Sequence, residues 1–256
     1  MKQVKYKEIA RKYDQNPERT KYMVVDGDLF NFIHKNQSDT VKVLDVACGT
    51  GIYLKCQQRF LPHNNIEWMG IDADEDMLEI AKSKVPNSTF VKSKAESLPF
   101  NSETFDYLYC SFAFHHFVDK SEALREMYRV LKLGGFLKII TISPEFLDRW
   151  YIYKFFPESK KIDLDRCWKS EKILNSMEEL GFKTEMRIEY IHQKFPARIL
   201  YDIAKNRDIS ELVLLDDSLY REGLDRLKNE DAQNTVIASV FTKITLKGIK
   251  SYKKNF

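Results

Sequence analysis

Small residues interrupt an apolar run in the stretch VLDVACGTG, residues 43–51. Ala47, Gly49 and Gly51 stand at every second position, and glycine lets a backbone take unusual dihedral angles and approach a ligand without a Cβ in between. A helix is expected to begin at Gly51, and free amide groups at a helix N-terminus bind polar ligand groups. Asp45 would either hold amides of this turn or bind an ammonium group. The stretch therefore predicts a ligand-binding turn.

An acidic residue follows the glycine turn, and its distance along the sequence indicates the kind of ligand. Asp72 comes directly after the apolar stretch 67–71 and lies 21 positions beyond Gly51. A carboxylate in this place accepts hydrogen bonds from ribose hydroxyls in nucleotide-binding sheets. The dinucleotide pattern G-x-G-x-x-G is not satisfied, so the pair indicates an adenosine-bearing ligand other than a dinucleotide. The simpler alternative is that the glycines serve only a tight turn and Asp72 only caps a helix.

Two adjacent histidines, His115 and His116, stand in the stretch FAFHHFVD. A histidine can act as a general base near neutral pH, so both are candidate catalytic residues; the alternative is that they only shape a pocket. No carboxylate or cysteine stands at a spacing that would complete a metal site with them. The four cysteines show no C-x-x-C spacing, so neither a zinc site nor a disulfide framework is expected.

Strands and helices must alternate to position these residues. Periodicity predicts strands over 41–46, 67–71, 89–91, 105–110 and 136–142, with helices over 51–60, 74–84 and 121–132, the last ended by Gly134 and Gly135. Two long strands are expected later, over 183–195 and 235–247, with a helix ending at Gly181 before them and helical sequence over 197–230 between them. Strand–helix alternation of this kind is typical of a doubly wound α/β sheet.

The amino-acid composition and net charge indicate which kinds of binding partner are expected. Hydrophobic residues make up 43% and charged residues 31%, as in globular proteins, and 41 basic against 38 acidic residues leave a net charge of only +3. This balance argues against nucleic acid as the partner, although basic residues gather in the first twenty residues and in the tail KGIKSYKKNF. No apolar run reaches membrane-spanning length and no signal core is seen, so we expect a cytoplasmic protein with no membrane partner.

Four stretches together resemble the class I S-adenosylmethionine-dependent methyltransferases. They are VLDVACGTG, GIDADEDMLEIAKSK, SKAESLPFNSETFDYLYCSFAFHHF and ALREMYRVLKLGGFLKI, in the family's order within residues 41–142. The similarity is to the branch that methylates small molecules, including those of ubiquinone and menaquinone biosynthesis. It implies a doubly wound, seven-stranded Rossmann-like sheet with helices on both faces and a helical, aromatic substrate cover. The chain 1–256 would then be one methyltransferase domain, with a helical cap over 1–36, a cofactor core over 41–142, and the substrate cover and last two strands over 143–256.

The resemblance also assigns roles to individual residues. Tyr13, in YKEIARKYD, would close over S-adenosyl-L-methionine, and Asp72 would bind its ribose. The remaining cofactor-binding residues implied are Asp45, Ala47, Gly49 and Gly51 at the methionine part, Ala73, Met77, Ala95 and Glu96 around the adenine, and Ser111 and Phe112 facing the methionine end. Apart from the resemblance, aromatic rings can shield a cation, so Tyr13, Tyr53 and Phe114 are candidates to shield the sulfonium. Two departures stand out: Ala47 replaces the loop's first glycine, and Lys94 stands where an acidic residue is common. An adenine hydrogen bond would therefore come from the backbone or from Glu96.

The function expected is in-line transfer of a methyl group to a small, partly apolar organic acceptor, by a monomer or homodimer without a metal. The aromatic segment RWYIYKFFPESKKIDLDRCW and residues 192–230 would form the acceptor's cover. One alternative is a tRNA methyltransferase of the wobble-uridine type, since CGTGIYL and HHF also resemble such enzymes. The other is a non-catalytic homologue that binds the cofactor as a sensor or scaffold.

Overall fold

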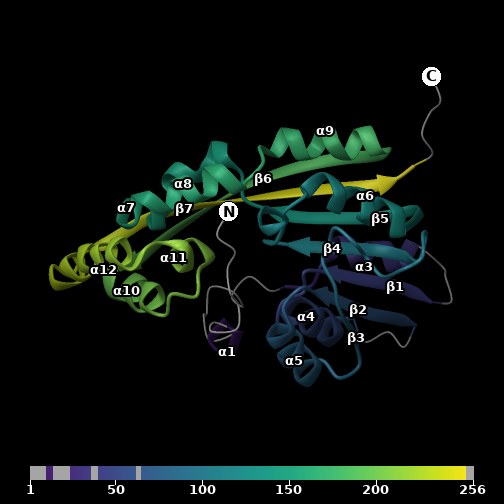
Figure 1. Cartoon of the computed structure of the whole chain (residues 1–256), viewed down its shortest axis with the longest axis horizontal. Coiled ribbons are helices and arrows are strands. Elements are labelled where there is room, and N and C mark those ends of the chain that lie inside the picture. Colours follow the sequence, from purple (N-terminus) through teal and green to yellow (C-terminus); the bar gives the residue numbers. More distant parts are fainter. Residues whose placement is uncertain (1–9, 14–23, 36–39, 62–64, 252–256) are drawn as a thin grey trace.

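Seven strands form one mixed sheet in the order β3-β2-β1-β4-β5-β7-β6 (Figure 1). The computed structural model describes residues 10–13, 24–35, 40–61 and 65–251. The strands are β1 (Val41–Val46), β2 (Ile66–Asp72), β3 (Thr89–Lys92), β4 (Phe105–Ser111), β5 (Leu131–Thr141), β6 (Phe182–Pro196) and β7 (Val236–Lys250). Strands β1 to β5 pair in parallel, whereas β7 runs antiparallel to both β5 and β6. The seven-stranded, doubly wound α/β sheet predicted from the sequence is confirmed.

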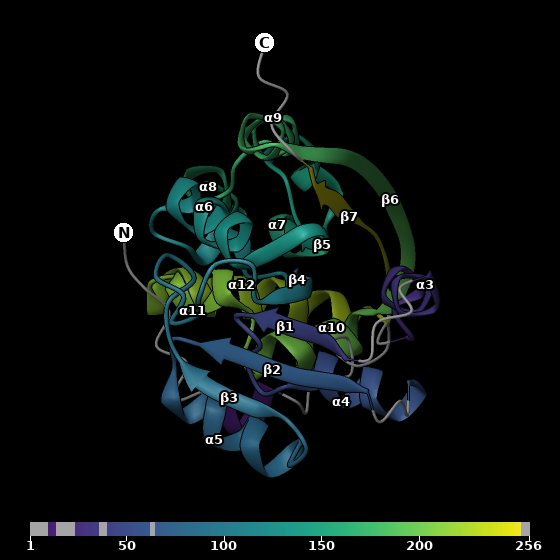
Figure 2. The same ribbon diagram turned by 90° about the vertical axis from the view of Figure 1, so that its right-hand side faces the viewer.

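Helices cover both faces of the sheet because the apolar residues of each strand alternate between the faces. Val43 of β1 packs toward α3 (Gly27–Lys35) and α4 (Ile52–Phe60), whereas Leu44 packs toward α6 (Lys120–Val130) and α9 (Ser170–Leu180). Figure 2 shows α4 and α5 (Glu75–Lys84) on the opposite side of the sheet from α6 and α9. The two resulting cores hold strands β1 to β5 in place, so that the carboxyl ends of these parallel strands lie along one edge of the sheet.

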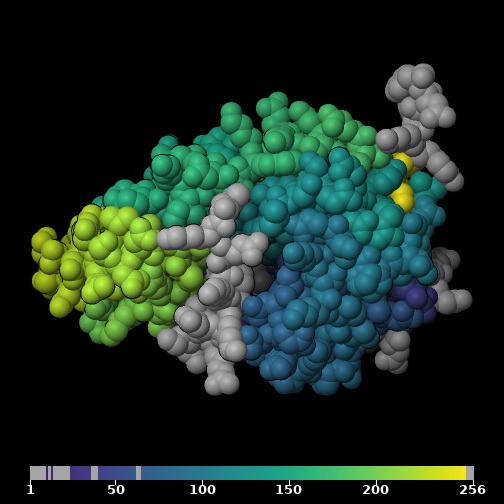
Figure 3. Space-filling view, in the orientation of Figure 1, coloured from purple at the N-terminus to yellow at the C-terminus, as the bar shows by residue number. Residues whose placement is uncertain are grey.

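A third core builds a cover beyond the carboxyl ends of the parallel strands (Figure 1). Its helices are η3 (Pro144–Arg149), α7 (Tyr151–Phe155), α8 (Pro157–Arg166), α10 (Ala197–Lys205), α11 (Ser210–Leu214) and α12 (Asp217–Ala232). The outer halves of β6 and β7 extend into this cover, where Phe195 and Ile237 join its core. Figure 3 shows α10 to α12 as a block at the end of the molecule away from β1 to β3. No helix in the described ranges is both long and apolar enough to cross a bilayer.

The boundary between α6 and β5 differs from the sequence prediction of a helix over 121–132. The helix ends at Val130, and Leu131 already pairs with Phe105 of β4. The β4–β5 register then shifts, so that Tyr107 pairs with Phe136, and Gly134, with φ of 77°, lies in the irregular segment between these pairs. The apolar periodicity of α6 continues past its end because Leu131 is buried as a strand residue.

Within the predicted N-terminal cap, 1–36, the structure describes two helices, α1 (Ala10–Tyr13) and α3. Residues 1–9, 14–23 and 36 of this predicted cap lie outside the described residues. Helix α1 packs against α5. The start of α3 is fixed by Asp26, whose carboxylate accepts hydrogen bonds from the backbone N–H groups of Asp28 and Leu29.

Asp26 is also the centre of a buried polar network that ties α3 to the sheet. Its Oδ2 accepts hydrogen bonds from the hydroxyls of Tyr53 and Tyr107, both at 2.9 Å, and Lys138 Nζ lies 2.7 Å from its Oδ1. Burial alone would lower the pKa of Lys138, but Asp26 and Asp28 outweigh it and the pKa is raised. Burial and the Asp26 charge raise the pKa of both tyrosines well above the usual value. The two tyrosines therefore stay neutral hydroxyl donors in this network, and Lys138 stays an ammonium.

Replacing the central carboxylate should cost much of the stability of the fold. In Asp26→Ala, two buried phenol hydroxyls lose their acceptor and Lys138 keeps only Asp28, so we expect the free energy of unfolding to fall by about 3 kcal/mol. Urea unfolding followed by circular dichroism measures this change.

Asp148→Ala is the matched control, because Asp148 pairs with Lys160 on the surface and its side chain is 77% exposed. An exposed pair contributes at most about 1 kcal/mol. Equal losses in the two variants would contradict the central role of Asp26.

Candidate active site

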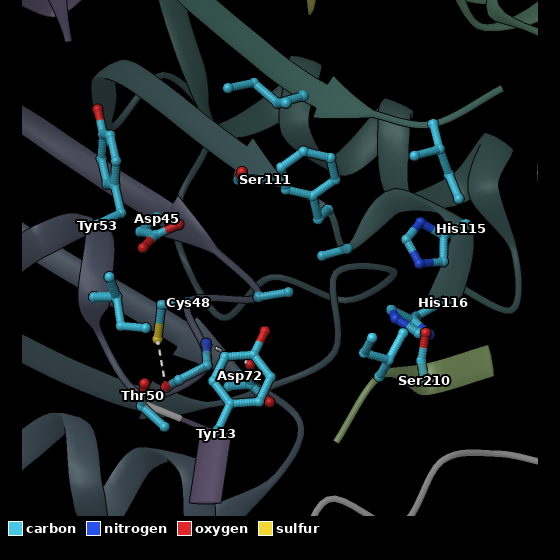
Figure 4. A pocket seen from close by; sticks show the side chains of 18 of the residues that line it. Tyr13, Asp45, Cys48, Thr50, Tyr53, Asp72, Ser111, His115, His116 and Ser210 are labelled. Atoms are coloured by element: carbon cyan, nitrogen blue, oxygen red, sulfur yellow. Dashed lines mark hydrogen bonds between the residues drawn. The ribbon is translucent and has the colours of Figure 1, made fainter. Parts of the chain in front are cut away.

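A cavity of about 1110 Å³ lies between the carboxyl ends of the parallel strands and the cover. Residues of the core and of the cover both line it. Figure 4 shows Asp45, Tyr53 and Asp72 on one side of this pocket and His115, His116 and Ser210 on the other. Ligands of doubly wound sheets bind at this edge, so the cavity is the candidate active site.

The loop after β1 takes left-handed backbone geometry three times. The φ angles are 59° at Ala47, 52° at Gly49 and 74° at Gly51. A Cβ added at Gly49 would meet nothing within 4 Å, so this backbone is bare toward the cavity. A Cβ at Gly51 would lie 3.2 Å from side-chain atoms of Ala81 in α5 and of Val85 directly after that helix. Gly49 thus leaves room for a ligand, whereas Gly51 allows the loop to pack against α5 and is not among the lining residues.

Asp72, at the end of β2, holds the glycine loop with its carboxylate. Its Oδ2 accepts the Gly49 N–H at 2.8 Å and its Oδ1 accepts the Asp74 N–H at 2.9 Å. The cap of α5 is Asp74, which accepts the Met77 N–H, so Asp72 is not itself the helix cap. Burial raises the pKa of Asp72, and the backbone N–H donors offset only part of that effect. One carboxylate therefore positions the loop at the edge of the cavity.

Asp45, at the end of β1, is a second carboxylate inside the same cavity. Only 3% of the residue is exposed. Burial, and then the charge of Asp72, raise its pKa well above the ordinary value. A cation bound between the two carboxylates would relieve this repulsion and favour their charged forms.

The cavity as a whole is lined by more acidic than basic residues. The acidic residues are Asp26, Asp45, Asp72, Asp74, Glu96, Asp165, Asp208 and Glu211; the basic ones, apart from the histidines, are Lys94, Lys138, Arg166 and Lys243. Lys138 is held by Asp26 and Asp28, and Lys243 by Glu189. Such a lining attracts cationic ligands and disfavours anionic ones.

The structure brings together nearly all the site residues predicted from the sequence. Those that line the cavity are Tyr13, Asp45, Ala47, Gly49, Tyr53, Asp72, Ala73, Met77, Ala95, Glu96, Ser111, Phe112, His115 and His116. Tyr53 stacks on Tyr109 with ring centroids 3.5 Å apart. Glu96 also has a local task, because its Oε1 accepts the Val118 N–H at 2.7 Å. Phe114, expected to shield a sulfonium, packs instead against Phe117 and Trp168 in the core and does not line the cavity.

The two histidines lie on η2 (Phe114–His116), with ring centroids 4.2 Å apart. Among the described residues, Nδ1 of His115 is buried without a hydrogen-bond partner. Burial, then His116 and nearby cationic side chains, hold the pKa of His115 well below its usual value. The His115 imidazole is therefore neutral near pH 7, a weak base that can still form a hydrogen bond with a ligand.

Some lining residues were not foreseen individually. Arg166 and Glu211 come from α8 and α11, and Trp150 and Phe241 add aromatic surface. The sequence had marked the segment containing Trp150 and Arg166 as a substrate cover, but nothing in it singled out the arginine.

In the described part of the chain, no group of three or more His, Cys, Asp or Glu side chains is placed so that it could hold a metal ion. Cys48 and Cys110 are buried, as expected for small hydrophobic residues, and burial raises the pKa of both thiols.

Comparison with known proteins adds an independent finding. Residues 44–139 match the family model described as "Methyltransferase domain". The chain is 38% identical over 117 residues to a demethylmenaquinone methyltransferase of Thermotoga maritima, covering 45% of this chain and 50% of the relative. It is 36% identical over 106 residues to the ubiquinone/menaquinone biosynthesis C-methyltransferase UbiE of Campylobacter jejuni, covering 40% and 45%. The matches thus span about half the length of these curated relatives.

Solved structures extend the likeness to the fold. A Bacillus halodurans protein described as a methyltransferase superposes with a TM-score of 0.61 at 24% identity, covering 88% of this chain and 100% of that one. The [4+2]-cyclase SpnF superposes with a TM-score of 0.54 at 20% identity, covering 94% and 81%. At these identities the likeness concerns the fold alone.

Ala47→Gly should not weaken the fold, although alanine-to-glycine changes usually do. A left-handed conformation costs a non-glycine residue about 1–2 kcal/mol of stability, a cost that glycine avoids. Because glycine loses more conformational entropy on folding, about 0.5–1 kcal/mol of that gain is offset. We therefore expect the free energy of unfolding to stay constant or rise by up to about 1 kcal/mol, as measured by urea unfolding.

Ala123→Gly, inside α6, provides the comparison. This change should lower the free energy of unfolding by about 1 kcal/mol or more, because glycine is a poor helix residue and a buried methyl group is lost. Similar losses at positions 47 and 123 would mean that Ala47 carries no strain.

Asp45→Asn should stabilise the protein at alkaline pH in the absence of ligand. Because the pKa of Asp45 is raised on folding, the folded state binds its proton more tightly than the unfolded state. The stability contributed by that proton is complete below the ordinary aspartate pKa and is lost as pH rises through the folded pKa. The free energy of unfolding of the variant should exceed that of the wild type, and by more at about pH 8 than at about pH 5.

The exposed Asp225→Asn in α12 is the control and should give no pH-dependent difference. A gain for Asp45→Asn that is the same at both pH values would show that the buried charge is not its cause.

Proposed function

We propose that this chain, whose core is a class I methyltransferase domain, transfers the methyl group of S-adenosyl-L-methionine to a small, partly apolar organic acceptor. The observation that carries the proposal is the bare backbone at Gly49 beside two carboxylates, the buried Asp45 and the half-buried Asp72, in a cavity that continues into an aromatic cover. A cationic, adenosine-bearing ligand matches the part of the cavity around Gly49 and the carboxylates. An apolar acceptor matches the part inside the aromatic cover.

The residues of the core fit S-adenosyl-L-methionine chemically. Gly49 leaves space for its chain, Asp72 offers a half-buried carboxylate to its ribose hydroxyls, and Met77 and Ala95 give an apolar wall for its adenine. Asp45 and the acidic lining favour its positive charge. When bound, it supplies a sulfonium methyl group whose displacement leaves the S–CH₃ electron pair on sulfur, as the neutral thioether S-adenosylhomocysteine.

The chain must then place an acceptor atom on the side of the methyl group opposite the sulfur, in line with the S–CH₃ bond, and must exclude water. Positioning of this kind can lower a barrier by about 7–11 kcal/mol. Trp150 and Phe241, with ring centroids 5.6 Å apart, form part of the apolar wall that would receive the acceptor. A base is required only if the reacting atom carries a proton, and His115, being neutral, would be a weak one. His116 is the other candidate for this role.

The names of two relatives give a first acceptor class to screen, namely hydroxylated aromatic rings of the quinone type. The family match covers residues 44–139 and leaves the cover unmatched, so the choice among O-, N- and C-methylation depends on residues of the cover.

The experiment that tests the proposal is a calorimetric titration with S-adenosylmethionine, S-adenosylhomocysteine and NAD. We expect micromolar binding of the two sulfur compounds and none of NAD. Asp72→Asn should weaken S-adenosylhomocysteine at least about tenfold, since the amide both misplaces the Gly49 loop and loses a ribose acceptor.

Asp76→Asn is the matched control, because Asp76 lies in the first turn of α5 but does not line the cavity. Its affinity for S-adenosylhomocysteine should equal that of the wild type. Binding of NAD in place of the sulfur compounds, or no effect of Asp72→Asn, would contradict the proposed cofactor.

A further inference from the structure

Strand β6 is an edge of the sheet, and no strand of the described ranges pairs with its outer side (Figure 2). It is fifteen residues long, whereas β3, at the other edge, has only four. Its ladder with β7 runs without a bulge, and its one proline, Pro196, is its last residue. Short length, bulges and internal prolines commonly protect an edge strand from pairing with another chain. These three features are missing from the first half of β6.

That half, residues 182–190, carries exposed side chains on both faces of the sheet. Lys183, Glu185 and Arg187 are exposed on one face, and on the other Met186 and Tyr190 are 36% and 53% exposed. Backbone N–H and C=O groups of every second residue also point away from β7. A further strand placed along this edge would therefore meet both hydrogen-bonding groups and side chains.

The charged residues on one face of this segment alternate in sign, in the order Lys183, Glu185, Arg187 and Glu189. Such a pattern can match a second copy of itself that runs antiparallel about a two-fold axis. With the axis beside Met186, Glu185 lies opposite Arg187 of the second copy, and Lys183 lies opposite its Glu189. Each pairing occurs twice, once on either side of the axis, and every charge on this face meets an opposite charge.

Other registers lack this match. An axis beside Glu185 would bring Lys183 opposite Arg187 of the second copy, and an axis beside Arg187 would bring Glu185 opposite Glu189. An axis beside Ile188 keeps only the pairing of Arg187 with Glu189. Opposite charges directly across a strand pair stabilise it and like charges destabilise it. The charges therefore favour the axis beside Met186.

Strand β7 continues the charge pattern within each chain. Lys247 pairs with Glu185 across the ladder, with Nζ 3.8 Å from Oε1, and Lys243 pairs with Glu189 at 2.8 Å. In the favoured register each of these carboxylates would lie between a cation of its own chain and a cation of the second copy. Rows of alternating charge would thus cross the junction between the two chains.

The apolar face fits the same register. Met186 would lie against its own copy, Ile188 against Thr184, and Tyr190 against Phe182. Side chains directly opposite one another in an antiparallel pair have Cβ atoms about 4.5–5.5 Å apart, so these groups would be in contact. The pairing would cover Met186 and Tyr190, both of which are exposed in the single chain.

We propose that β6 pairs with β6 of a second copy of this chain, antiparallel over residues 182–190, and joins two sheets into one. Residues 182–190 do not line the cavity. This pairing therefore goes beyond the proposed function and does not depend on it.

Sedimentation equilibrium of the full chain tests the pairing. We expect the wild type to show a reversible monomer–dimer equilibrium with a micromolar dissociation constant. Glu185→Lys and Arg187→Glu each place like charges opposite one another twice, so each should raise that constant at least about tenfold. In an equimolar mixture of the two variants, the introduced charges face each other and the other row keeps its native pair. The mixture should dimerise with about the wild-type affinity.

Lys194→Glu is the matched control, because Lys194 is exposed on the same strand but lies beyond the paired segment. This variant should dimerise as the wild type does. A wild type that stays monomeric at about 100 μM would overturn the proposal. Dimerisation that neither charge reversal weakens, or a mixture no tighter than its two components, would overturn it as well.

Thermal unfolding of each variant shows whether it is folded. If a charge-reversal variant is not, hydrogen exchange of the wild type above and below its dissociation constant decides the question. Amides of residues 182–190 should exchange more slowly in the dimer, while those of β3, at the other edge, should not change. Protection that appears elsewhere and not over 182–190 would overturn the pairing.

Discussion

The cost of burying carboxylates governs how this molecule is built around its cavity. Desolvation of a charge is repaid only by close partners, and each buried aspartate meets that demand differently. Asp26 is met by Lys138 and two tyrosines. Asp163 is paired with Arg166 and Tyr153, yet burial and the nearby Glu211 raise its pKa to about 8. At Asp72, backbone N–H groups offset only part of the effect of burial on the pKa. Asp45 forms no ion pair within the described residues, and burial and Asp72 raise its pKa well above the ordinary value.

Two of these aspartates also join parts of the chain that are far apart in sequence. Asp26 links the segment before α3 to β4 and β5, and Asp163 and Arg166 link α8 to α11 through Glu211. Because Asp26, Arg166 and Glu211 also line the cavity, the polar interactions that hold these elements together also shape its walls.

The core could be predicted from sequence because its signals are local. Alternating apolar residues in β1 and β4, the glycine turn and the acidic residue after β2 depend on neighbours a few positions away. The helix boundary at Val130 was missed because Leu131 satisfies helical and strand spacing equally well. The Arg166 cluster could not be foreseen, since its partners come from α8 and α11, segments that only the tertiary fold brings together. The roles assigned to individual cofactor-binding residues remain predictions.

A shared fold does not by itself determine the reaction, as the structural likeness to a [4+2]-cyclase illustrates. In this chain the cover lines the cavity with Arg166 and with the rings of Trp150 and Phe241, whereas His115 lines it from η2. The cover lies outside the residues that match the family model, so its side of the cavity is the part to compare among relatives.

Strands β6 and β7 are each fifteen residues long and run continuously from the sheet into the cover. At about 3.3 Å per residue, such a strand reaches roughly 50 Å, and their ladder is paired from Phe182 to Pro196 without a break. The pair therefore ties the cover to the sheet through one uninterrupted ladder of backbone hydrogen bonds. A displacement of the cover as a whole would have to bend or break that ladder.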